Sequence, residues 1–357
     1  MKIAVLVSGG VDSSLALKLL KEQGHELVAF YLKIWLEDEV SFLGTCPWEE
    51  DLTYAQAVCD QLGVELRVVS LQKEYWERVV AYALNEIKQG RTPNPDVMCN
   101  QQIKFGMFLD HIDDSFEKVA TGHYAQVEEV DGVFKLKQAP DPVKDQTYFL
   151  CYLSQQQLKR ALFPIGHLTK EQVRALAAEY DLPTKSRKDS QGICFLGKLK
   201  FNDFIKQYLG EQVGDLVEYE TGKVLGAHKG YWFHTIGQRQ GLGLAGGPWY
   251  VVAKDIPTNR VFISRNYYTD DKKRDELTVA GVRWISELSP DLPVYVKLRH
   301  GPAVHQALVT VLSDDRVHIK LAQDDQGIAA GQFAVIYQQG YCIGAGVIES
   351  SGSSRSI

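Results

Sequence analysis

Short runs of apolar, mostly β-branched residues alternate with amphipathic stretches over about the first 125 residues of the chain. The elements that this pattern predicts are strand 3–7, helix 13–23, strand 26–35, helix 52–62 and strand 65–70. Strands that are joined through helices make right-handed crossovers and pair in parallel. The pattern therefore predicts a doubly wound α/β domain with a parallel sheet.

The pattern changes twice beyond this region. A strand at about 118–121, followed by a hairpin that turns at Asp131-Gly132, is expected to end the sheet. Helical patterns then cover about 154–161 and 169–180, the second with Thr169 as its N-cap. From about Phe201, short alternating segments separated by glycines predict two small β-rich domains, the last of them barrel-like.

These changes divide the chain into four predicted parts. They are an α/β domain with a helical extension over 1–200, a small central β-rich domain over 201–273, a C-terminal β-barrel over 274–349 and a tail over 350–357. The tail is rich in serine and has almost nothing to bury, so we expect it to be disordered.

The composition fits a soluble protein of two or three domains, with 357 residues, 45% of them hydrophobic and 24% charged. No run approaches the roughly 18 apolar residues of a membrane span, so no membrane contact is expected. A strand directly follows Met1 and Lys2 and leaves no room for a leader, which favours a cytoplasmic location. A formal net charge of −6 leaves the class of partner open, because a local basic face can still bind phosphates.

The segment SGGVDSS, residues 8–14, joins the first predicted strand to the first predicted helix. Free backbone N–H groups at a helix N-terminus bind anions, and glycines allow the backbone to approach a phosphate closely. We expect the hydroxyls of Ser8, Ser13 and Ser14 to donate to phosphate oxygens, and Asp12 to orient the loop or help hold Mg²⁺. The spacing matches neither a Walker A loop nor GxGxxG. The alternative is a tight βα turn without a ligand.

Six cysteines are spread over the chain without a CxxC pair, which argues against a structural zinc and a disulfide framework. In residues 90–105 Cys99 follows Asp96 and precedes a helix predicted from about Gln101. A thiol near a helix N-terminus has a lowered pKa and is reactive. The alternative is a small buried cysteine in a structured turn.

The second cysteine segment is KSRKDSQGICFLG, residues 185–197, in which basic side chains precede Cys194. Such neighbours favour a thiolate or persulfide as well as a phosphate backbone. The alternative is a solvated basic loop with a buried cysteine. Core packing is expected for Cys59, Cys151 and Cys342, whereas the surroundings of Cys46 favour neither role.

SGGVDSS resembles the PP-loop of ATP pyrophosphatases, which cleave ATP between its α and β phosphates. With GRTPNPDVMCN, ATGHYA, KDQTYFL, KDSQGICF and HTIGQRQGLG in the same order, the chain resembles the tRNA-specific 2-thiouridylases from residue 3 to about residue 349. The resemblance implies an N-terminal domain of the adenine nucleotide alpha-hydrolase type. It also implies ATP-dependent 2-thiolation of the wobble uridine of tRNA, with AMP and pyrophosphate as products.

The resemblance also carries over site residues. Those implied to bind ATP are Leu6, Val7, Ser8, Gly9, Gly10, Val11, Asp12, Ser13, Leu32 and Gly122. Those implied to contact tRNA are Asn94, Pro95, Asp96, His123, Lys144, Asp145, Gln146, Arg299, His300 and Gln332. The implied catalytic groups are Cys99 as nucleophile, Cys194 as persulfide carrier and Asp96 as acid or base.

Bland alternatives exist for several of these residues. His123 could cap a strand end, Lys144–Gln146 could form a polar turn, and Gln332 could satisfy a β-turn. The chain departs from the family pattern at Arg299-His300-Gly301, where Arg-Tyr and a further basic residue are usual. Stacking on a base is still possible for a histidine ring.

The implied cofactors are ATP and Mg²⁺, the latter bound with the nucleotide. The implied partners are tRNAs, those for Lys, Glu and Gln, and a sulfur donor such as a cysteine desulfurase or a sulfur-relay protein. Two other functions compete with this hypothesis. One is a PP-loop ligase or amidotransferase that acts on a small metabolite, and the other is a tRNA-binding module without catalysis.

Overall fold

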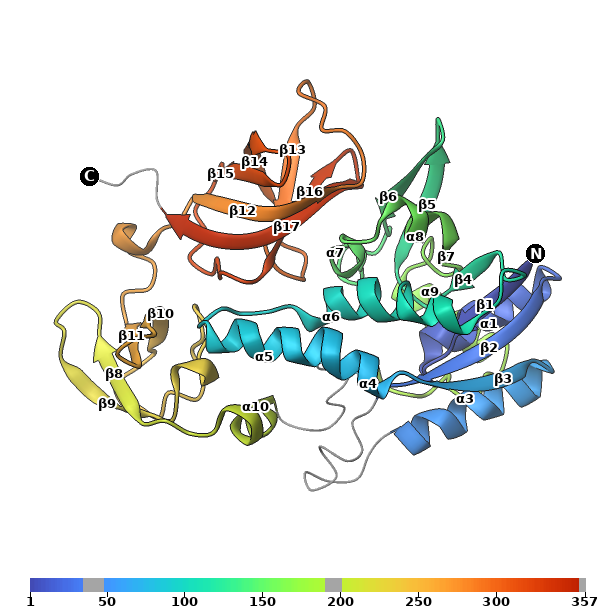
Figure 1. The fold of residues 1–357 in the computed structure, drawn as a ribbon, viewed down its shortest axis with the longest axis horizontal. Coiled ribbons are helices and arrows are strands. Elements are labelled where there is room, and N and C mark those ends of the chain that lie inside the picture. The colour runs from blue at the N-terminus through green and yellow to red at the C-terminus, as the bar shows by residue number, and fades with distance from the viewer. Residues whose placement is uncertain (35–47, 190–200, 353–357) are drawn as a thin grey trace.

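The computed structural model describes residues 1–34, 48–189 and 201–352 (Figure 1). A parallel sheet with the strand order β3-β2-β1-β4-β7 forms the centre of the N-terminal part. Its strands are β1 (Lys2–Leu6), β2 (Glu26–Lys33), β3 (Glu65–Ser70), β4 (Lys118–Ala120) and β7 (Ala161–Leu162). No helix within the described residues is long and apolar enough to cross a membrane.

Helices cover both faces of this sheet, so the central strand β1 is buried on both sides. Ile3 and Val5 pack against helices α1 (Val11–Glu22) and α3 (Trp48–Leu62). Ala4 and Leu6 belong to the core on the opposite face. That core includes helices α4 (Gln72–Tyr75), α5 (Ala81–Lys88) and α6 (Pro95–Met98), with a π-helical segment at Trp76–Val80 between the first two. The predicted doubly wound α/β fold is confirmed.

The helix near Cys99 begins earlier than the sequence predicted. Pro95 is its first residue, and Asn94 caps it by accepting a 3.3 Å hydrogen bond from the Val97 N–H at Oδ1. Proline fits this position because its missing N–H has no partner in the first turn of a helix. A π-helical segment, Cys99–Lys104, and a 3₁₀ turn, Met107–His111, continue the chain. Cys99 therefore lies inside the helix and not ahead of it.

The predicted hairpin is present, but the sheet does not end there. Strands β5 (Ala125–Val130) and β6 (Val133–Gln138) turn at Asp131-Gly132, where both residues have positive φ. The chain then returns to the parallel sheet through β7, and β6 pairs with the C-terminal strand β17 (Tyr341–Gly352). Helices α7 (Thr147–Leu150), α8 (Gln155–Arg160) and α9 (Lys170–Glu179) follow β6, and Ser154 and Thr169 form capping boxes on the last two.

Two β-rich units follow helix α10 (Phe201–Leu209). The smaller has the order β10-β11-β8-β9, with β8 (Gly214–Glu218), β9 (Val224–His228), β10 (Tyr250–Asp255) and β11 (Arg260–Ser264). Short 3₁₀ turns lie at Tyr231–Phe233 and Asp270–Lys272. The larger contains β12 (Glu276–Trp284), β13 (Val294–Lys297), β14 (His305–Ser313), β15 (Arg316–Leu321), β16 (Phe333–Gln338) and β17.

Pairing of β12 with β17 closes the larger unit into the expected barrel. This pairing extends to Glu276 opposite Gly352, so residues 350–352 belong to a strand. The predicted tail is therefore wrong for these three residues, which gain a partner strand that the local sequence does not reveal. Residues 353–357 lie outside the described residues.

The turn after α5 touches both β-rich units, which lie on either side of the C-terminal end of this helix in Figure 1. On one side the Tyr231 hydroxyl donates to the Lys88 carbonyl. On the other side the Thr92 N–H donates to the Ala330 carbonyl at 2.8 Å. The side-chain amide of Gln332 donates to the carbonyls of Thr92 at 3.0 Å and Pro93 at 3.1 Å. Both units are therefore anchored next to the start of α6.

A buried ion pair makes a second connection between the α/β domain and the barrel. Lys297 of β13 contacts Asp145 at 2.9 Å, and the two side chains are only 3% and 1% exposed. Asp145 also accepts hydrogen bonds from the Gln138 amide, the Ala139 N–H and the Thr147 hydroxyl. The carboxylate is thereby compensated by several donors at once.

Replacing Lys297 by methionine is expected to lower the free energy of unfolding by about 3–5 kcal/mol, because the carboxylate of Asp145 would stay buried without its counter-charge. Chemical denaturation followed by tryptophan fluorescence measures the change. The control is Lys185→Met, which breaks an exposed pair with Asp181 and should cost about 0–1 kcal/mol. A loss for Lys297→Met no larger than that of the control would contradict the role of this pair.

Candidate active site

The loop between β1 and α1 is held in shape by its own serines. Gly9 has φ +71°, and a Cβ atom there would lie 2.3 Å from the Asp51 carbonyl oxygen, so only glycine fits. The Ser13 hydroxyl accepts from the Ser8 N–H at 3.1 Å and donates to the Gly10 carbonyl at 3.2 Å. The Ser14 hydroxyl donates to the same carbonyl at 2.8 Å. The protons of Ser13 and Ser14 that were expected for phosphate thus close the loop in this structure.

The other predicted nucleotide residues lie at the same edge of the sheet. Parallel strands end together, and Val5 of β1 is paired with Ala29 of β2 and Ala120 of β4. Gly122 lies two residues after the end of β4, and a Cβ atom there would lie 2.6 Å from the Ser13 backbone nitrogen. Leu32 lies near the end of β2. Open α/β sheets bind their ligands at this edge, outside the carboxyl ends of the strands.

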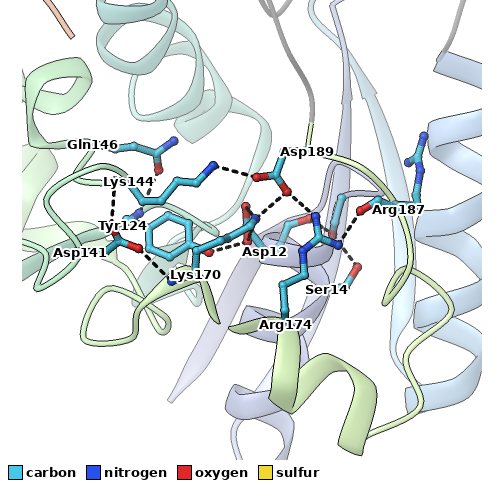
Figure 2. A network of polar contacts seen from close by, with 12 residues as sticks. Asp12, Ser14, Tyr124, Asp141, Lys144, Gln146, Lys170, Arg174, Arg187 and Asp189 are labelled. Atoms are coloured by element: carbon cyan, nitrogen blue, oxygen red, sulfur yellow. Dashed lines mark hydrogen bonds and ion pairs between the residues drawn. The ribbon is translucent and has the colours of Figure 1, made fainter. Parts of the chain in front are cut away.

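Asp12, in the first turn of α1, is fully engaged (Figure 2). It accepts hydrogen bonds from the Tyr124 hydroxyl at 2.7 Å and from the Lys170 ammonium at 2.8 and 2.9 Å. Within the described residues no group of three His, Cys, Asp or Glu side chains is arranged to hold a metal ion. Of the two roles expected for Asp12, these contacts support orientation of the loop.

Asp189 is the acceptor for three cationic side chains above this loop (Figure 2). Lys144 and Lys170 each lie 2.8 Å from its carboxylate, and Arg174 also contacts it. Burial raises the pKa of Asp189, but hydrogen bonds from Lys144 and Lys170 outweigh it and hold the pKa well below its usual range. The carboxylate is therefore charged at neutral pH.

Arg187, two residues earlier, binds the nucleotide loop itself. Its guanidinium donates to the Gly9 carbonyl at 2.8 Å and to Asp51 at 2.7 Å, and it lies 4.3 Å from the ring centre of Tyr54. Arg187 lies in the basic segment before Cys194 that the sequence singled out. Asp189 lies in the KDSQGICF segment but was not recognised as a site residue, and neither were Lys170 and Arg174, which no local pattern marks.

Cys99 is buried, and its predicted low pKa is wrong. The side chain is 1% exposed in the core beneath the sheet. Burial raises the pKa of the Cys99 thiol to about 11; Lys104 lowers it and Asp96 raises it, both by less. The expectation failed because the helix starts at Pro95, which places the thiol in its second turn. Cys194 and Cys46 lie outside the described residues, while Cys59, Cys151 and Cys342 are buried as expected of core residues.

Asp96 has one buried carboxylate oxygen, Oδ1, without a hydrogen-bond partner in the part of the chain that the structure describes. An unpaired buried oxygen is costly, and such atoms in native structures call for an explanation. Asp96 is one helical turn before Cys99, and the two interact electrostatically. A substrate group that donates a hydrogen bond to Oδ1 would remove this cost.

Most of the residues implied to contact tRNA gather near Asp96. The pKa of the His300 imidazole is lowered by burial and then by Lys297, and this ring also senses the charges of Asp96 and Lys144. Because this pKa is lowered, the His300 ring is neutral at pH 7. The residue is exposed and its ring lies 4.6 Å from that of Phe149, so it is available for stacking. Arg299 beside it is half exposed and binds Asp325 at 2.8 Å.

Other implied tRNA contacts are engaged within the protein. Asp145 is buried in the ion pair with Lys297, which leaves it no surface to offer RNA. Gln332 uses its amide on Thr92 and Pro93, and Gln146 accepts from the Tyr124 N–H at 2.9 Å. His123 is buried, and its Nδ1 lies 2.7 Å from the Thr121 hydroxyl. Burial lowers the pKa of His123 well below its ordinary value, so this ring is neutral too.

Family models match most of the chain. One described as the tRNA methyl transferase HUP domain covers residues 1–198, and others described as the tRNA methyl transferase PRC-barrel domain and the aminomethyltransferase beta-barrel domain cover 202–265 and 274–348. The tRNA-specific 2-thiouridylase MnmA of Parabacteroides distasonis is 46% identical over 355 residues, which is 98% of this chain and 99% of that protein. The chain belongs to the tRNA-specific 2-thiouridylase family.

A second member of this family, tRNA-specific 2-thiouridylase MnmA 1 of Bacteroides thetaiotaomicron, is also 46% identical and also covers 98% of the chain and 99% of its own length. A solved 4-thiouridine synthetase in complex with RNA and bound ATP is 15% identical, with a TM-score of 0.35 over 58% of this chain and 50% of that chain. That likeness is too low to bear on the site.

Alkylation of Cys99 by iodoacetamide should be slow at pH 7 and should accelerate by about tenfold per pH unit up to at least pH 9.5, because only the thiolate reacts. Peptide mass spectrometry after timed labelling of the native full chain gives the rate. The same peptide in urea is the control, and its rate should level off above pH ~8.5, the pKa of a free thiol. A plateau below pH 9 in the native protein would show that the thiol is not held protonated.

Replacing Gly122 by alanine should weaken ATP binding about tenfold, because the added methyl group would push the first turn of α1 out of place. Calorimetric titration of the free protein with ATP measures the affinity. Gly352→Ala is the control, since no atom lies within 4 Å of a Cβ at that position. Equal affinity in the two variants would separate Gly122 from the nucleotide site.

Proposed function

We propose that this chain replaces the oxygen at C2 of the wobble uridine of tRNA by sulfur in a reaction that consumes ATP. The observation that carries the proposal is the position of Asp96, with its unpartnered carboxylate oxygen, one turn before Cys99 in a helix whose preceding residues are bound by Gln332 of the barrel. The names of relatives of equal length support the substrate.

ATP is proposed to bind at the carboxyl ends of the strands. Gly9 and Gly122 let the loop approach the backbone of Asp51 and Ser13 closely, which holds it in shape, and the N-terminus of α1 supplies N–H groups for the phosphates. Residues Leu6–Ser13 would surround the phosphates, and Leu32 would border the adenine. Mg²⁺ is proposed to enter with the nucleotide, bound to its phosphates, since Asp12 is already committed to Lys170 and Tyr124.

The chemistry requires that the uridine oxygen first become a leaving group. Its O2 attacks the α-phosphate of ATP, pyrophosphate departs, and the base carries AMP on O2. We assign to Asp96 the exchange of a proton with the base at this stage. The terminal sulfur of a persulfide on Cys194 then forms a bond to C2, and the C2–O bond breaks as AMP leaves.

Cys99 completes the transfer. Its thiolate attacks Sγ of Cys194, the sulfur–sulfur bond of the persulfide breaks, and its electron pair stays on the sulfur now bound to C2. The protein is left with a Cys99–Cys194 disulfide, which a thiol reductant must reduce before the next turnover. Burial of Cys99 means that its proton has to be removed during the reaction, and we assign this step to Asp96, whose charge acts on the thiol.

The proposed tRNA surface consists of side chains around this helix. Its members are Asp96, Lys144, Gln146, Arg299 and His300. The other implied residues, Asn94, Pro95, His123 and Gln332, are buried or bound within the protein and would act by positioning these side chains. Asp145 would act indirectly, because its buried ion pair fixes the flanking residues Lys144 and Gln146. The substrates proposed are the tRNAs for Lys, Glu and Gln, the sulfur donor is a cysteine desulfurase or relay protein, and the reaction is placed in the cytoplasm.

Incubation of tRNA with the protein, ATP, Mg²⁺, a cysteine desulfurase with cysteine as persulfide donor, and a thiol reductant should replace one oxygen by sulfur in the anticodon, as measured by nucleoside mass spectrometry. Cys99→Ser and Cys194→Ser should abolish this product while ATP binding remains. Cys59→Ala, which removes a core thiol of α3, is the matched control and should stay active.

Full activity of either serine variant would contradict the proposal. AMP formation with a small acceptor in the absence of tRNA would favour a metabolite ligase. Failure to release pyrophosphate in the complete mixture would favour a binding module without catalysis.

A further inference from the structure

Asp189 is bound by more positive charge than one carboxylate can neutralise. Its Oδ1 is shared by Lys170 and Arg174, and its Oδ2 is contacted by Lys144. Lys170 lies between this carboxylate and that of Asp12, at 2.8 Å from each (Figure 2). Other carboxylates face the same group: Asp141 accepts from the backbone N–H groups of Lys144 and Lys170, and Asp51 binds Arg187. The cations therefore already have anionic partners in the free protein.

These cations surround the place where phosphates are expected. Lys170 is the first residue of α9 and is bound to the first turn of α1, while Arg187 donates to the Gly9 carbonyl. Arginine and lysine bind phosphate oxygens strongly, and arginine does so with two parallel N–H groups. A pyrophosphate group at the N-terminus of α1 would come within reach of the same side chains that bind Asp189.

The ion pair of Asp189 with Lys144 is more exposed to solvent than the structural pair of Asp145 with Lys297. Asp189 is 28% exposed and its partner Lys144 is 37% exposed, whereas Asp145 and Lys297 are 1% and 3% exposed. A partly exposed pair can be reached by other anions from solvent, so another anion can take the place of the carboxylate. Asp12 is held additionally by the Tyr124 hydroxyl, while the cations on Asp189 sit at the ends of long, flexible side chains.

We infer that Asp189 is an internal counter-ion that occupies a pyrophosphate site formed by Lys170 and Arg174, with Lys144 beside it. The terminal phosphates of a nucleoside triphosphate replace the Asp189 carboxylate on these cations when they bind, and pyrophosphate leaves as the carboxylate returns. The inference rests on the proposed function and deepens it. It names the residues that bind the departing pyrophosphate, and it identifies the Asp189 carboxylate as the group that competes with pyrophosphate for them.

The test is calorimetric titration of the full chain with inorganic pyrophosphate at low salt, without nucleotide or tRNA. Asp189→Asn removes the competing charge and should bind pyrophosphate about fivefold more tightly than the original protein. Lys170→Gln and Arg174→Gln should each bind it about fivefold more weakly, because each loses a charged donor. The control is Asp181→Asn, the same change at an exposed aspartate that pairs with Lys185, and its affinity should be unchanged.

A role for Asp189 in merely holding the cations in position predicts the opposite sign. Unchanged or weaker pyrophosphate binding by Asp189→Asn would overturn the inference. The inference would also fail if this variant bound tRNA more tightly but pyrophosphate no more tightly than the original protein. If the asparagine variant does not fold, Asp189→Ala must show the same gain. An original protein that thiolates tRNA while Asp189→Asn gains no affinity refutes only this inference, whereas an original protein that neither binds ATP nor thiolates tRNA refutes the proposed function.

Discussion

The hydrogen bonds from the Gln332 amide to the carbonyls of Thr92 and Pro93 fix the point on which the proposed site depends. Helix α6 starts only two residues later, so the position of Asp96 and Cys99 relative to the sheet follows from this turn. The smaller β unit contacts the last residue of α5, just before this turn, through Tyr231. Asn94 and Pro95 start the helix locally, and contacts from distant parts of the chain hold the segment that leads into it.

Charge serves two different purposes around this helix. The pair of Asp145 and Lys297 is shielded from water and surrounded by further donors, so it joins the barrel to the α/β domain permanently. The group around Asp189 is open to solvent and linked to the nucleotide loop through Lys170. A structural ion pair and an exchangeable group of ion pairs therefore lie near the same helix, and the extent of their burial distinguishes them.

Much of the fold could be predicted because its signals are local. Alternating strands and helices, the Asp131-Gly132 turn and the cap at Thr169 depend on neighbouring residues. The pKa of Cys99 was mispredicted because the helix was expected to begin at about Gln101, whereas it begins at Pro95, a residue that is favourable at the first helical position. The contact of Lys170 with Asp12 spans 158 residues, and only the folded chain shows it.

The pairing of β6 with β17 attaches the barrel to the hairpin of the α/β domain, although the barrel is already closed by the pairing of β12 with β17. Leu136 and Lys137 lie opposite Cys342 and Tyr341, and the Gln138 N–H donates to the Gly340 carbonyl at 2.8 Å. Without the hairpin, the backbone groups at the start of β17 would face water and could pair with another chain. The barrel is therefore less of an interchangeable module than its closure suggests, because a protein that acquired it alone would also have to evolve a cover for that edge.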